Sequence, residues 1–92
     1  MRAIPLDLPG SELVCAGLRD LADGVESVEA LLVSIGEPRL RQIGLDVPEP
    51  LPDADHRLYE RLAADDPDGA HSRYNSLVRR LVSFERAASC VV

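Results

Sequence analysis

Apolar residues recur along two long segments of the chain at alternating intervals of four and three residues. In the first segment they are Val14, Leu18, Leu21, Val25, Val28, Leu32 and Ile35, and in the second they are Ala70, Tyr74, Leu77, Leu81, Phe84, Ala88 and Val91. This spacing places one apolar seam along a helix and is typical of helices that pack at a shallow angle. The pattern therefore predicts two long helices.

Local signals predict where the first long helix begins and ends. Ser11 is a typical N-cap residue, and Gly36 is a typical residue to follow the last helical turn. Gly24 lies inside the segment and allows two interpretations: one helix over about 11–35, kinked at the glycine, or a break at 23–26 followed by a fresh capping box. Because the apolar phase continues across Gly24, we favour one helix.

The remaining elements follow from proline and aspartate positions. Asp66 is the expected N-cap of the second long helix, with Pro67 at its first helical position, which proline tolerates. Between the long helices, residues 37–43 fit a short helix, and residues 53–64 fit another. Residues 45–52 contain three prolines and are expected to form an extended connector.

Composition agrees with a helical domain of modest size. Fourteen Leu, nine Val and ten Ala must fill the core, because the only aromatic residues are Tyr59, Tyr74 and Phe84. Leu and Ala favour helices, whereas a β domain would be richer in β-branched and aromatic residues. We predict one all-α domain over residues 1–92, a helical bundle built on a long antiparallel helical hairpin with two shorter helices. Residues 1–10 are expected to form an extended N-terminal arm.

Small residues lie beside both apolar seams. In the first segment Gly10, Gly17 and Gly24 recur every seven residues, and in the second the small residues are Ser72, Ser76, Ser83, Ala87 and Cys90. Two readings stay open at this point. These flanks are either places where helices cross closely, or the ordinary result of a composition rich in small residues.

Charge and cysteine content bear on location and partners. The net charge is −6, and residues 1–68 carry fifteen acids against six arginines, a balance of −9, whereas residues 69–92 have a balance of +3. The acidic total argues against general affinity for nucleic acids or anionic membranes. No apolar run is long enough for a membrane span, and the first ten residues do not resemble a signal peptide. The sequence has only two cysteines, Cys15 and Cys90, which is too few to indicate a disulfide framework, although a bond between them stays open. We therefore expect a cytoplasmic protein, in which both thiols would be reduced.

The polar clusters do not form a recognisable catalytic or metal-binding motif. Asp65, Asp66 and Asp68 surround a proline between two helices, where aspartate commonly caps helices and forms turns. His56 and Glu60 are four residues apart, but a zinc site would need further ligands at suitable spacing. Neither a nucleophile-elbow motif nor a phosphate-binding loop is present. We expect no enzyme activity, no cofactor and no metal.

The C-terminal helix has a polar face with several arginines. His71, Asn75, Arg79 and Arg86 fall on one outward face, and Arg73 and Arg80 lie on another edge. Asn and Arg at such positions are able to read base edges in DNA. Since the arginines are divided between two faces of an acidic chain, ion pairing with a neighbouring helix or an acidic partner is the favoured interpretation.

Several aliphatic residues are left over once the two seams are paired, above all Leu31, Val33, Val78 and Val82. Such residues are expected to form a patch that a monomer would leave in water, and patches of this kind mark interfaces. A homodimer in which each protomer contributes two long helices would bury them.

The predicted function is that of a non-catalytic protein-interaction or assembly module, an adaptor or regulator that also self-associates. The predicted interface consists of Leu31, Val33, Val78, Val82, Arg79 and Arg86. The alternative is a small dimeric DNA-binding regulator that uses the arginine-bearing C-terminal helix.

Overall fold

The computed structural model describes residues 8–91, and side chains as far as residue 90. These residues form five helices and no strand, which confirms the all-α prediction. The helices are α1 (Ser11–Ala22), α2 (Val28–Ile35), α3 (Glu37–Gln42), α4 (Ala54–Asp65) and α5 (Ala70–Val91). Residues 1–7 of the predicted arm lie outside the described residues, and residues 8–10 form a bend and a turn that lead into α1. The N-cap of α1 is Gly10, and Ser11, the predicted N-cap, is the first residue of the helix.

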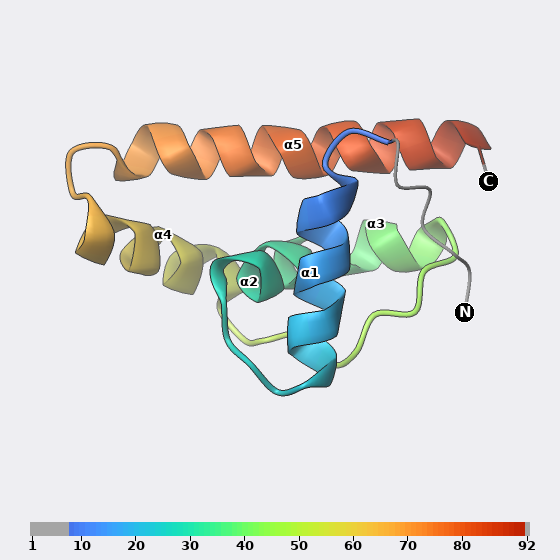
Figure 1. The fold of residues 1–92 in the computed structure, drawn as a ribbon, viewed down its shortest axis with the longest axis horizontal. Coiled ribbons are helices and arrows are strands. Elements are labelled where there is room, and N and C mark those ends of the chain that lie inside the picture. Colours follow the sequence, from blue (N-terminus) through green and yellow to red (C-terminus); the bar gives the residue numbers. More distant parts are fainter. Residues whose placement is uncertain (1–7, 92) are drawn as a thin grey trace.

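Helix α5 runs along the long axis of the molecule, and the other helices gather on one side of it (Figure 1). α4 returns antiparallel beneath the N-terminal half of α5, while α3 follows α2 beneath its C-terminal half. α1 lies across this arrangement and packs against both α2 and α5. The predicted hairpin of two long helices is not confirmed, because the helical hairpin in the structure pairs α4 with α5.

The first apolar segment forms two helices, so the single helix expected over 11–35 is wrong and the alternative break is correct. Gly24 has a φ of 74°, in the left-handed region that favours glycine, and it lies in the turn that follows α1. Ser27 then caps α2, where its Oγ accepts a hydrogen bond from Ala30 N at 3.0 Å and donates one to Asp20 Oδ2 at 2.7 Å. Apolar residues on both sides of the break share one core, but Val25, within the break itself, is 49% exposed.

Helix α2 is the centre of that core. Five consecutive residues of α2 are buried: Ala30, Leu31, Leu32, Val33 and Ser34. A helix that is apolar on every side is typically surrounded by other elements, and α2 packs against α1, α4 and α5. Because other helices lie on several sides of α2, its apolar residues are buried on faces that a helix with a single packed side would expose to water.

Close helix crossing explains two of the three recurring glycines. A Cβ on Gly17 would overlap Val33 Cγ2 on α2, and a Cβ on Gly10 would stand 2.8 Å from Arg80 O on α5. Gly24 has no atom within 4 Å of such a Cβ, so its role is the turn. On α5, by contrast, the small residues Ser72, Ser76, Ser83 and Cys90 are exposed and mark no crossing.

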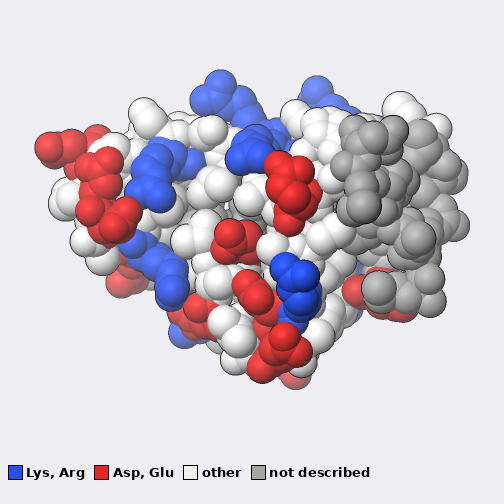
Figure 2. Space-filling model, in the orientation of Figure 1, with Lys and Arg blue, Asp and Glu red and all other residues white. Residues whose placement is uncertain are grey.

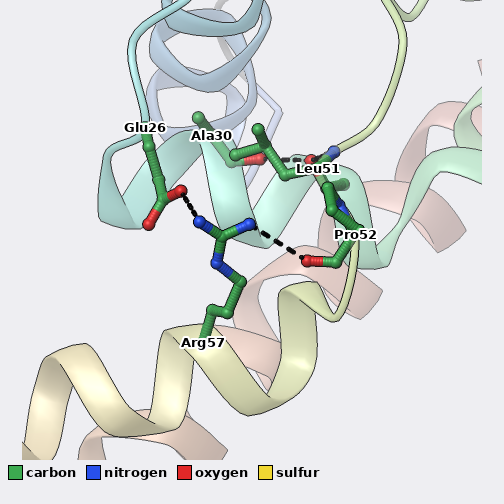
Figure 3. A network of polar contacts seen from close by, with 6 residues as sticks. Glu26, Ala30, Leu51, Pro52 and Arg57 are labelled. Carbon is green, nitrogen blue, oxygen red and sulfur yellow. Dashed lines mark hydrogen bonds and ion pairs between the residues drawn. The ribbon is translucent and has the colours of Figure 1, made fainter.

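Helix α3 and the connector agree with the prediction. α3 ends before Gly44, whose φ is 94°, and residues 45–51 form neither helix nor strand. The connector is fastened to the helices by hydrogen bonds: Arg41 Nη2 donates to Val47 O at 2.9 Å, and Leu51 N donates to Ser34 Oγ at 3.0 Å. At its end, Arg57 on α4 binds Pro52 O and forms an ion pair with Glu26 (Figure 3).

The start of α5 differs from the expectation. Asp66 ends α4 as its C-cap, residues 67–69 form a turn, and α5 begins at Ala70. Asp66 Oδ1 accepts a hydrogen bond from Gly69 N at 3.2 Å. Asp66 and Pro67 therefore build the turn of the α4–α5 hairpin instead of opening the second helix.

Candidate interaction face on α5

The polar face predicted for the C-terminal helix is present on α5. His71, Asn75, Arg79 and Arg86 are all exposed. His71 Nε2 lies 3.2 Å from Asn75 Nδ2, and Arg79 Nε donates to Asn75 O at 3.4 Å, so these side chains share one side of the helix. We call Arg79, Val82 and Arg86 the arginine face.

The four arginines of α5 fall into two groups. Arg73 forms an ion pair with Asp65 at 2.9 Å, and Arg80 forms one with Glu12 at 2.8 Å, so both hold α5 to neighbouring helices. Arg79 and Arg86 have no carboxylate partner within the described part of the chain. Arginine side chains project along the α5 edge of the molecule, whereas many acidic side chains lie over the other helices (Figure 2).

The six residues of the predicted interface do not lie on one surface. Val78 and Val82 are half-buried on α5, and Val78 also packs against the core. Leu31 and Val33 are 0% exposed, so the expectation that they would lie in water is wrong. The physical reason is the position of α2, which is enclosed by three helices. Leu31 and Val33 are core residues of the protomer and offer no contact area to a partner.

Glu85 is a buried carboxylate that the sequence analysis did not single out. It is 6% exposed and lies against the α2–α3 junction, where a Cβ on Gly36 would stand 2.9 Å from Glu85 Oε2. Burial raises the pKa of Glu85, and the positive charge of Arg39 opposes this effect. Its position in the sequence could have indicated this burial, because Glu85 is the only acid on α5 and directly follows Phe84 of the apolar seam.

Two of the clefts that are lined by described residues adjoin α5. The first has a volume of about 420 Å³ and lies between α1, α2 and α5, with Leu13, Val28 and Leu77 among its lining residues. The second has a volume of about 210 Å³ and lies between α3 and the C-terminal half of α5. Its lining consists of Arg39, Gln42, Ile43, Glu85, Arg86 and Ser89.

The clusters considered for metal binding have structural partners. Asp65 pairs with Arg73, Asp66 closes a turn, and His56 Nε2 lies 2.5 Å from Glu60 Oε1 on the exposed side of α4. Among the described residues, no three His, Cys, Asp or Glu side chains are placed to share a metal ion.

The two cysteines are free thiols in the structure. Cys15 is half-buried on α1, and Cys90 is exposed near the end of α5. Within residues 8–91, no helix is both long and apolar enough to cross a bilayer.

Comparison with known proteins identifies no relative: no family model, no curated protein and no solved structure matches the chain.

Proposed function

We propose that this chain is a non-catalytic interaction module that presents the arginine face of α5 to an acidic protein partner. The observation that carries the proposal is the difference between the two groups of arginines. Arg73 and Arg80 are used within the protomer, whereas Arg79 and Arg86 extend from the same helix without a carboxylate partner among the described residues.

The spacing of this face fits a helical or extended acidic segment. Arg79 and Arg86 are seven residues apart, so they lie almost in line on α5 and about 10 Å apart along its axis. Val82 lies between them, one turn from each, and is half-buried. A partner with two carboxylates flanking an apolar side chain would complement this arrangement of charge and apolar surface.

This face is less suited to a symmetric dimer. A two-fold axis through it would bring Arg79 close to Arg79 or Arg86 of the second copy, and the only acid on α5, Glu85, faces the interior. The predicted homodimer stays a prediction. It has lost two of the apolar residues on which it relied, Leu31 and Val33.

The alternative function, a DNA-binding regulator, keeps one supporting observation: His71, Asn75, Arg79 and Arg86 share an exposed face. Such binding would weaken steeply with salt, with a slope of about −0.9 per phosphate contact. Absence of duplex binding at low salt would exclude it. For either function we assign the chain to the cytoplasm, where Cys15 and Cys90 would stay reduced.

The proposal is tested with a designed helical peptide that carries two glutamates seven residues apart and a leucine between them. We expect it to bind the chain, and we expect Arg79→Glu and Val82→Glu each to lower the affinity at least about tenfold without unfolding the protein. Arg61→Glu is the matched control, because Arg61 is exposed on α4. Equal loss in the control, or no loss in the two α5 variants, would contradict the proposal.

Light scattering at low and high salt tests the predicted dimer separately. A dimer at both salt concentrations that persists in Val82→Glu would place self-association on another surface. A monomer would leave the arginine face available to a different protein.

A further inference from the structure

The side chain of Glu85 is almost fully buried, and its carboxylate lies at the wall of a cleft and is not fully enclosed. The residue is 6% exposed, and no group in the described residues donates a hydrogen bond to it or pairs with it at ion-pair distance. Its position over Gly36 leaves no room for a side chain there, since a Cβ on Gly36 would also stand 3.0 Å from both Leu81 methyl carbons. A carboxylate in such a largely buried position, with no ion-pair partner among the described residues, would be stabilised by a cation or a hydrogen-bond donor in the cleft.

Glu85 lines the cleft between α3 and the C-terminal half of α5. The cleft volume of about 210 Å³ is below the roughly 300–1,000 Å³ that is usual for drug-sized ligands. An occupant of this cleft is therefore a small molecule with few carbon atoms.

The charges that line the cleft have both signs. Arg39 on α3 and Arg86 on α5 line it together with Glu85. Arg39 and Glu85 interact electrostatically, yet they form no direct ion pair. A purely anionic ligand would meet the Glu85 carboxylate, and a purely cationic ligand would meet the two guanidinium groups. A molecule with both charges satisfies all three side chains.

We propose that this cleft binds a small zwitterion that carries one ammonium and one carboxylate group. The ammonium pairs with Glu85, and the carboxylate pairs with Arg39 and Arg86, which hold it by charge-assisted hydrogen bonds. Ile43 gives the short carbon chain an apolar contact, and the Gln42 amide is able to donate and to accept. The proposed binding of the zwitterion is reversible and involves no covalent bond.

This site is independent of the proposed function, although Arg86 lines the cleft and also belongs to the arginine face. The decisive variants are therefore Glu85→Gln and Arg39→Gln, which leave the arginine face unchanged. Arg79→Gln is the matched control, because Arg79 is an exposed arginine of α5 that does not line the cleft. Loss of acidic-peptide binding and loss of zwitterion binding are then distinguishable.

The experiment is an NMR titration of the full chain with glycine, β-alanine and 4-aminobutyrate, three zwitterions with different charge separation. We expect at least one to shift the amide signals of Gly36, Arg39 and Ser89 saturably, with a Kd of about 1 mM or lower. Ethylammonium and propionate, each with one of the two charges, are expected to bind at least about tenfold more weakly. The pKa of Glu85 is expected to fall on binding, because the ligand ammonium favours its charged form.

Glu85→Gln and Arg39→Gln are each expected to weaken zwitterion binding at least about tenfold, and Arg79→Gln is expected to leave it unchanged. The proposal is overturned if none of the three zwitterions gives saturable shifts at about 50 mM. It is also overturned if a single-charge probe binds equally well, or if Glu85→Gln binds as tightly as the original chain. Since Gln is isosteric with Glu and removes a buried charge, failure to fold is not expected to obscure the result.

Discussion

Val33 packs directly against Gly17 where α1 and α2 cross, and the Cγ2 methyl of Val33 occupies the place that a Cβ on residue 17 would need. The Glu29 carbonyl lies equally close to that position. Neither the backbone oxygen nor the fully buried valine has free space into which to move. The crossing therefore depends on the absence of a side chain at Gly17.

We expect Gly17→Ala to destabilise the protein by about 1–3 kcal/mol, as is usual for overpacking of a core. The comparison variant is Gly24→Ala, which adds a Cβ in open space and costs about 1 kcal/mol through its positive φ alone. Urea unfolding followed by circular dichroism measures both changes. A Gly17→Ala protein as stable as the original chain would show that α1 and α2 separate without cost.

Val33 and Val82 were assigned to the same surface from the sequence, but their burial predicts different responses to truncation. Val33→Ala removes two methyl groups from the core and is expected to cost about 1.5–3 kcal/mol. Val82 is half-buried, so Val82→Ala is expected to cost less than about 1 kcal/mol. Denaturant midpoints compare the two variants, and equal losses would be inconsistent with the enclosed position of α2.

The cap at Ser27 is expected to be needed for the start of α2. Ser27→Ala removes the acceptor for Ala30 N and the donor to Asp20, and we expect a loss of about 1 kcal/mol. Ser83→Ala is the control, because Ser83 is exposed within α5, where alanine is the better helix former. Thermal unfolding of the two variants distinguishes loss of the cap from a general effect of replacing serine.

Burial raises the pKa of Glu85 above its ordinary value of 4.5, so the folded state favours the protonated carboxyl. Through this group, stability is expected to fall as pH rises from about 4.5 through the raised folded-state pKa, and to stay constant above it. Glu85→Gln removes this dependence. The variant is expected to be more stable than the original chain at pH 7, with the difference disappearing below the ordinary pKa.

Urea unfolding at several pH values between about 3.5 and 7.5 measures this difference. Glu49→Gln, the same change at an exposed residue of the connector, controls for net charge. A difference that is the same at every pH would show that the carboxylate is not destabilised by burial.

Short-range signals predicted much of this fold. The end of α2 at Gly36, the short α3 and the extended connector follow from glycine and proline positions, whose effects are local. Gly24 was the place where two local rules disagreed. Apolar periodicity favoured continuation, but a glycine in the left-handed region followed by a serine cap ended one helix and began another.

The remaining differences depend on what surrounds a residue in three dimensions. Leu31 and Val33 are surplus on a helix with one apolar side, and they are buried because three helices enclose α2. The Glu85 cleft brings Arg39 of α3 beside the second half of α5. No pattern within either segment indicates that these two elements meet.

The fastened connector also limits how copies of this chain can stick to one another. An extended segment at a protein surface invites cross-chain β-pairing through its free amide groups, which is a common route to aggregation. In residues 48–52, three prolines have no amide hydrogen, and the amide of Leu51 is held by Ser34. Only Glu49 is left to donate, so this stretch is extended without being a template for fibril growth.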